Sequence, residues 1–212
     1  LWVSYSVNKE DMWISRIPVP VEINASAHAD DDFSKFGSIA ELTNWNIYSP
    51  VWAPVSLEGA WLKLQDKDPF DYAKVERKIP ASKELKVSFD LLAEQNDKGR
   101  LQIDFLDGNS IACSRLELTP DGIFRMKGGS RFANMMNYEA GKTYHVEAVL
   151  STADRKIFQQ TSQQGYHYGG PCSVAGGLAA LGVQLPDHRP DMGQCGTPAA
   201  QSVHRAVSGP QG

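Results

Sequence analysis

The sequence predicts an all-β protein whose main part is an antiparallel β-sandwich. Short strand-like runs recur at regular spacing between Leu57 and Leu150, and polar turns separate them. Apolar and polar residues alternate with period two in runs such as Leu85–Leu91, so each strand has one buried and one solvated face. We find no convincing helical pattern in the chain.

The first element is a hairpin. Leu1–Pro20 reads LWVSYSVNKEDMWISRIPVP, in which two strand-like runs flank the polar turn Asn8–Asp11. Because two strands alone bury too little apolar surface to be stable in water, we expect the hairpin to complete a larger sheet. No initiator Met and no signal-peptide pattern precede it. We therefore expect a fragment whose parent has its main activity upstream of Leu1.

The segment SVNKEDMWISRIPVP resembles the closing segment of the bacterial neuraminidase-repeat (BNR, sialidase-like) β-propeller proteins, which are secreted carbohydrate-active enzymes. The resemblance implies that residues 1–23 are the last hairpin of a truncated β-propeller. The missing N-terminal blades of the same parent chain would then be its partner. In this family such a segment leads out of the propeller into a C-terminal β-sandwich.

An aromatic-rich connector follows over residues 24–55, with an acidic run at Asp30–Asp32 and then Trp45, Tyr48 and Trp52. One interpretation is that these rings pack two domains together. The other is a platform on which sugar rings stack. The stretch WNIYSPVWAPVSLEG also resembles the connector that precedes the sandwich in the same family, which favours packing.

Residues 56–156 read as the sandwich. The run KLQDKDPFDYAKVERKIP and the meander after it resemble the concanavalin-like, laminin-G-like jelly roll appended to such enzymes, in which a further strand after Leu150 completes a sheet. Residues 97–99, 107–109, 120–122 and 128–129 supply turn residues that tolerate positive φ. The predicted strands are Leu57–Leu64, Tyr72–Ile79, Leu85–Leu92, Leu101–Leu106, Ile111–Leu118, Ile123–Met126 and Thr143–Leu150.

Residues 157–212 differ in composition from the rest. They contain four charged residues among ten Gly, eight Gln and five Pro, and strand alternation is barely present. We expect an irregular or disordered C-terminal segment, with the last strands of the sandwich missing. A second hypothesis is that this segment is translated out of frame. The pair Met192-Gly193 is compatible with it, because ATG-GGN read one nucleotide later contains the Trp codon TGG.

Composition excludes several classes. A net charge of -4 gives no broad electrostatic reason to bind nucleic acid or anionic lipid. No run approaches the roughly 18 to 20 apolar residues of a membrane span. The three cysteines form neither a disulfide framework nor a metal spacing, and no glycine-rich phosphate loop occurs. No cofactor is expected, apart from a structural Ca²⁺ considered next.

Two polar clusters are candidate sites. Asn8, Lys9, Glu10 and Asp11 could bind sugar hydroxyls or supply an acid or base if the hairpin lines a propeller pocket; the alternative is a solvated turn. Asp66, Asp68 and Asp71 offer the hard oxygen ligands that Ca²⁺ prefers, but the Gly and terminal Glu of an EF-hand loop are absent, which favours a plain Asp-rich turn.

The functional hypothesis is a fragment of a secreted, periplasmic or cell-surface glycoside hydrolase that acts on polysaccharide or glycan, with the sandwich as an accessory domain. The fragment itself should be inactive, since no catalytic carboxylate pair or tyrosine–arginine set is assembled. Neither His28 nor His145 has a neighbouring nucleophile that predicts a triad. Alternatively, the sandwich binds carbohydrate through Trp61, Tyr72 or polar residues of a concave face, or only supports the propeller.

Overall fold

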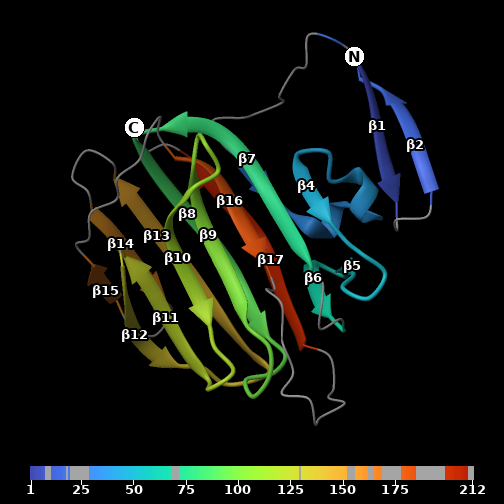
Figure 1. Ribbon diagram of the computed structural model, residues 1–212. Helices are drawn as coiled ribbons and strands as arrows, with labels where there is room; N and C mark the ends of the chain where they lie inside the picture. Colours follow the sequence, from blue (N-terminus) through green and yellow to red (C-terminus); the bar gives the residue numbers. More distant parts are fainter. Residues whose placement is uncertain are drawn as a thin grey trace.

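The computed structural model describes residues 1–7, 11–17, 19, 29–67, 72–128, 130–151, 156–161, 165–168, 178–184 and 199–209. It confirms the all-β class: apart from two 3₁₀ turns, η1 (Phe33–Lys35) and η2 (Ile39–Glu41), every element described is a strand. Figure 1 shows two large sheets packed face to face and a separate hairpin. The strands are β1 (Trp2–Val7), β2 (Asp11–Arg16), β3 (Ala29–Asp31), β4 (Trp45–Tyr48), β5 (Val55–Glu58), β6 (Trp61–Asp66), β7 (Lys74–Ser82), β8 (Glu84–Ala93), β9 (Leu101–Asp107), β10 (Ala112–Leu118), β11 (Ile123–Gly128), β12 (Arg131–Asn137), β13 (Lys142–Ser151), β14 (Lys156–Thr161), β15 (Gly165–Tyr168), β16 (Leu178–Gln184) and β17 (Ala199–Gly209).

The two large sheets form the sandwich. The seven-stranded sheet has the order β12-β11-β10-β9-β16-β7-β4, and the eight-stranded sheet has the order β15-β14-β13-β8-β17-β6-β5. All pairings are antiparallel, and β3 adds to β17. Strands distant in sequence are therefore neighbours, as expected of a jelly-roll-like sandwich in which the chain crosses repeatedly between sheets.

The core lies between the sheets and follows the period-two alternation. In β8, for example, burial alternates along the whole strand, so that Leu85, Val87, Phe89 and Leu91 face inward. Aromatic rings fill much of the interior, because each buries a large apolar area. The largest fully buried side chains include Phe33, Phe89, Phe105, Phe124 and Tyr144.

Two strand predictions need correction. The run Leu57–Leu64 is not one strand but parts of β5 and β6, because Gly59 adopts a positive φ of 62° and reverses the chain so that Glu58 pairs with Trp61. The strand β12 was not predicted, since its alternation is irregular. A shift of its register against β11, between Phe124 and Arg125, accounts for the broken pattern.

The connector contributes to the sandwich itself. Its strand β4 forms the edge of the seven-stranded sheet, and Phe33 packs against Trp45 with ring centroids 5.6 Å apart inside the same core. A buried ion pair adds a polar link, in which Arg77 Nε of β7 donates to Asp31 Oδ2 of β3 at 2.8 Å. Part of the described connector, including Phe33 and Trp45, is thus packed into the domain that follows it.

Four strands lie in or at the start of the C-terminal segment. β14 and β15 extend the eight-stranded sheet at one edge, whereas β16 and β17 occupy central positions between β9 and β7 and between β8 and β6. The backbone of a central strand forms hydrogen bonds with a neighbour on each side, and these bonds do not depend on its side chains. The weak alternation of apolar and polar residues is therefore compatible with β16 and β17. Other residues of the segment lie outside the described part of the chain, and the reading-frame hypothesis stays a prediction.

Candidate functional site

The outer face of the seven-stranded sheet carries an ordered set of charged side chains. Along β9, β10 and β11 the apolar residues face the core, and the residues between them face outward. The antiparallel register aligns these outward residues in two rungs across the strands. We call this set, with Arg100 just before β9, the charged face; its members are Arg100, Gln102, Asp104, Arg115, Glu117, Arg125, Lys127 and Phe132.

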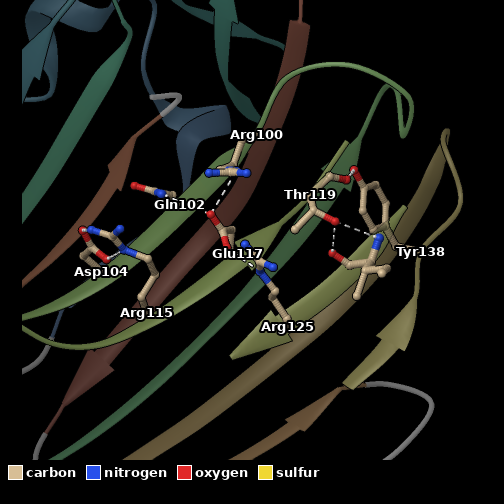
Figure 2. Close-up of polar contacts among 9 residues, drawn as sticks. Arg100, Gln102, Asp104, Arg115, Glu117, Thr119, Arg125 and Tyr138 are labelled. Carbon is tan, nitrogen blue, oxygen red and sulfur yellow. Dashed lines mark hydrogen bonds and ion pairs between the residues drawn. The ribbon is translucent and has the colours of Figure 1, made fainter. Parts of the chain in front are cut away.

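Glu117 occupies the centre of the charged face (Figure 2). Its carboxylate is only 1% exposed, and three donors surround it. Arg100 Nε lies 3.0 Å from Oε1, Gln102 Nε2 donates to Oε1 at 3.2 Å, and Arg125 Nε donates to Oε2 at 2.6 Å. A carboxylate buried to this extent is tolerated only when it is paired and hydrogen-bonded, and this one meets both conditions.

The neighbouring rung holds a second ion pair. Arg115 donates from Nε and Nη2 to the two oxygens of Asp104, at 2.6 and 2.8 Å, which is a bidentate pair. The hydrogen bonds that Arg115 donates to Asp104 raise the pKa of its guanidinium above the usual value. Arg115 is thereby committed to Asp104.

The β12 side of the charged face ends in an exposed aromatic ring. Phe132 is 42% exposed, the Arg125 guanidinium carbon lies 4.2 Å from its ring centroid, and Lys127 Nζ lies 5.6 Å from it. Both contacts are within cation–π range. With four cationic side chains against two carboxylates, the charged face has a local excess of positive charge in a chain of net charge -4.

The opposite edge of the same sheet also carries exposed aromatic surface. Tyr48 on β4 is exposed, and its ring centroid lies 5.3 Å from that of Tyr72. Next to it on β7, Glu76 is buried between Lys78 and Lys74, at 2.8 and 3.2 Å. Burial alone would raise the pKa of Glu76, but the two lysines hold it below its usual range. The sheet thus presents aromatic rings at both edges and fixed charges between them.

The predicted sugar-binding residues Trp61 and Tyr72 are not on one sheet, since Tyr72 precedes β7 and lies outside any strand. Trp61 belongs to β6 of the eight-stranded sheet and alternates with the inward-facing Leu62, whereas Tyr72 packs against Tyr48 at the edge of the seven-stranded sheet. The structure therefore does not bring them into one site. Of the connector aromatics proposed as a stacking platform, Trp45 is buried in the core, and Tyr48 and Trp52 are exposed.

The other predicted sites fall largely outside the described residues. Asn8, Lys9 and Glu10 are not described, and for Asp11 only the backbone is, at the start of β2. Asp66 is described and buried, whereas Asp68 and Asp71 are not described. Both site hypotheses stay predictions. Within the described ranges, no three His, Cys, Asp or Glu residues gather where they could hold a metal ion.

His145 has a neighbouring hydroxyl group, although the sequence predicts no nucleophile near it. Its Nδ1 lies 2.7 Å from Asp90 Oδ1 and its Nε2 lies 3.2 Å from Ser88 Oγ, on the outer face of the eight-stranded sheet. The order Ser–His–Asp is that of a triad, but a triad also needs backbone N–H donors for an oxyanion. The strands β8 and β13 are each paired on both sides, so their N–H groups serve the sheet. We interpret the cluster as a surface hydrogen-bond chain.

Sequence reasoning missed the charged face, although a signal was present. Charged or polar residues recur two positions apart at Gln102 and Asp104, at Arg115 and Glu117, and at Arg125 and Lys127. Such spacing is also typical of an ordinary solvated face of a sheet. Three consecutive strands with the same spacing, joined by short turns, would have predicted a charged patch across a sheet.

The fold defines a class: a jelly-roll-like β-sandwich of the kind shared by lectins and polysaccharide-active enzymes. It aligns with the Emp47p carbohydrate recognition domain at 9% identity and TM-score 0.60, covering 88% of this chain and 96% of that one. It also aligns with the alginate lyase Aly36B, solved with an alginate trisaccharide, at 8% identity and TM-score 0.62, covering 88% and 99%. At these identities the likeness shows the fold alone.

The family follows from two stronger matches. The family model "Sialidase-like, CBM domain" matches residues 45–166, more than half of the chain, which therefore belongs to this family of sialidase-like carbohydrate-binding modules. A solved sialidase is 68% identical over 100% of this chain with TM-score 0.86, and the chain spans 21% of its length. The expected resemblance to sialidase-like proteins is confirmed. No curated protein matches the chain.

The carbohydrate-related role that we expected is supported at this level. As for membranes, none of the described residues lies in a helix that is long and apolar enough to span a bilayer.

Proposed function

We propose that the chain is a glycan-binding accessory module of a secreted or cell-surface sialidase-like glycoside hydrolase, and that the glycan lies across the outer face of the seven-stranded sheet. The observation that carries this proposal is the combination on one face of exposed rings, Phe132 and Tyr48, with hydrogen-bonding side chains held in fixed positions between them. Aromatic rings suit the apolar faces of sugars, and the polar groups between them suit hydroxyls.

The width of the face fits an oligosaccharide. From β4 to β12 the sheet has six inter-strand steps. At about 4.8 Å a step this is on the order of 29 Å, enough for several sugar units in line. The charged side chains are also partly immobilised by their mutual ion pairs, which lowers the entropy lost on binding.

Affinity electrophoresis of the 212-residue chain against a glycan panel tests the proposal. We expect retardation by at least one glycan, and we expect Phe132→Ala to weaken it by about tenfold through loss of the stacking surface. Trp13→Ala is the matched control, because it removes an exposed ring from the hairpin instead. Absence of retardation on every glycan would leave the alternative, a purely structural module.

We further propose that the hairpin β1–β2 docks onto the N-terminal part of the parent chain. The resemblance to sialidase-like proteins implies that this part is a β-propeller. The hairpin forms a sheet of its own with large apolar residues exposed on both faces: Trp2 (69%), Met12 (76%) and Ile14 (71%) on one, Tyr5 and Trp13 on the other. A two-stranded sheet with this much exposed apolar surface is typical of an interaction site. The sialidase match supports this, since most of that protein lies outside the matched region.

Co-elution tests the docking. The part of the 68%-identical sialidase that is not matched by this chain is expressed alone and mixed with the 212-residue chain on a gel-filtration column. We expect a complex. We expect Met12→Ser with Ile14→Ser to abolish it, because the two substitutions remove apolar surface that the complex would bury. The matched control is Val51→Ser with Trp52→Ser, which changes exposed apolar residues of the sandwich. A complex that survives the hairpin substitutions would contradict the docking.

A further inference from the structure

The three arginines of the charged face are held in two different ways. Arg115 uses Nε and Nη2 together on Asp104. Arg100 and Arg125, by contrast, each approach Glu117 through Nε, and among the described residues no hydrogen bond is assigned to their terminal Nη1 and Nη2 groups. Each of these two guanidiniums therefore retains four N–H donors for an acceptor that the described part of the chain does not supply.

Glu117 fixes the position of both guanidiniums. The Glu117 side chain is only 1% exposed, so loss of either arginine partner would leave a buried charge poorly compensated. Both guanidiniums are therefore held close to the carboxylate. The arginines themselves stay accessible, at 45% exposure for Arg100 and 27% for Arg125. Two cations held by one buried acid, with free terminal donors, can pair with a planar carboxylate or with two oxygens of a tetrahedral sulfate ester.

The surroundings of Arg125 favour a ligand in which the anionic group is attached to a sugar ring. Its guanidinium lies over the exposed Phe132, and Lys127 Nζ lies on the same ring. No carboxylate is paired with Lys127 among the described residues. An anionic sugar could therefore contact the apolar ring and the cations at the same time.

We propose that Arg100, Arg125 and Lys127 form a recognition site for an anionic group, a carboxylate or a sulfate ester, on the bound glycan. This inference rests on the proposed glycan-binding function and specifies the chemical class of its ligand. Glu117 acts as a positioning residue, which holds the two arginines without touching the ligand.

Calorimetric titration of the 212-residue chain with matched ligand pairs tests the class. Trigalacturonate is compared with its methyl ester for the carboxylate, and N-acetylglucosamine 6-sulfate is compared with N-acetylglucosamine for the sulfate. We expect the anionic member of one pair to bind at least about tenfold more tightly than the neutral member, and that pair identifies the group. We expect the preference to weaken as salt is raised.

Substitutions test the residues. Lys127→Gln and Arg125→Gln should each reduce the anionic preference by about fivefold to tenfold, whereas Lys86→Gln on the outer face of the eight-stranded sheet should leave it unchanged. Lys127→Gln leaves the buried ion pairs intact, so it reports on binding even if Arg125→Gln destabilises the fold.

Glu117→Gln separates a positioned site from simple charge attraction. The substitution makes the face more positive, so charge attraction alone predicts tighter anion binding, and a site positioned by Glu117 predicts weaker binding. Tighter binding, or equal affinity for both members of each ligand pair, would overturn the inference and leave the glycan-binding proposal standing. Absence of binding to these ligands and to every glycan of the panel would overturn both.

Discussion

Replacement of Arg77 by alanine is expected to lower the free energy of unfolding by about 3 to 5 kcal/mol, because it leaves the carboxylate of Asp31 buried without its partner. Arg77 Nε donates to Asp31 Oδ2 at 2.8 Å, Nη1 donates to the Lys78 carbonyl at 2.8 Å, and both charged residues are less than a tenth exposed. Urea unfolding followed by intrinsic fluorescence measures the loss.

A double variant and a surface pair complete this test. Asp31→Leu combined with Arg77→Met removes both charges and keeps apolar volume, so we expect it to recover most of the stability that Arg77→Ala loses. Lys35→Ala breaks the exposed pair with Asp32 in the same connector and should cost much less than Arg77→Ala, because solvent screens this pair. Equal losses for Arg77→Ala and Lys35→Ala would contradict the assignment of Arg77 as a buried link between connector and sandwich.

The alternation of apolar and polar residues predicted the parts of the fold that depend on one buried face. In β8 and β9 every second side chain must enter the core, and the sequence repeats this requirement directly. Turn chemistry was equally informative, since Gly99 and Gly122 both adopt the positive φ expected of them. In the turn after β9, however, the positive φ falls on Ser110 instead of Gly108.

The connector could not be predicted in this way. Phe33, Leu42 and Trp45 are buried in the sandwich core, yet they lie in 3₁₀ turns, loops and a four-residue strand that lack any period. The pairing of Asp31 with Arg77 joins residues 46 positions apart and depends on where β3 lies against the sheets. Burial of an irregular segment is a property of the tertiary structure, and no local pattern reports it.

The contacts within the charged face could not be predicted either, because they depend on how the strands pair in the tertiary structure. Glu117 faces Gln102 on one neighbouring strand and Arg125 on the other, and a register shift by one residue would replace both with core residues. The sequence shows that each of these residues is on a solvated face, but only the register shows that they meet. The prediction of Trp61 or Tyr72 as a sugar-binding residue lacked this information too, because the sequence does not show that Trp61 lies on the eight-stranded sheet and Tyr72 beside the edge of the seven-stranded one.

Tyr138, in the turn at one end of the charged face, is expected to make the folded protein less stable at alkaline pH. Tyr138 is 3% exposed, and its hydroxyl donates to the Thr119 carbonyl at 2.7 Å (Figure 2). Burial, reinforced by the charges of Asp97 and Asp121, raises the pKa of Tyr138 to about 12. The folded protein therefore keeps this proton up to a pH at which the unfolded chain has already released it, and below pH of about 10 both states hold it.

The sign of the dependence follows from this difference. Between pH values of about 10 and 12, ionisation in the unfolded state alone should remove about 1.4 kcal/mol of stability per pH unit. Tyr138→Phe lacks the titrating group, and at neutral pH it should cost only about 1 kcal/mol, because the Gly122 N–H still donates to the Thr119 carbonyl. The stability curves of the two proteins, measured by urea unfolding from pH 7 to 12, are therefore expected to cross near pH of about 11. Parallel curves would show that Tyr138 ionises equally in both states and would contradict the burial argument.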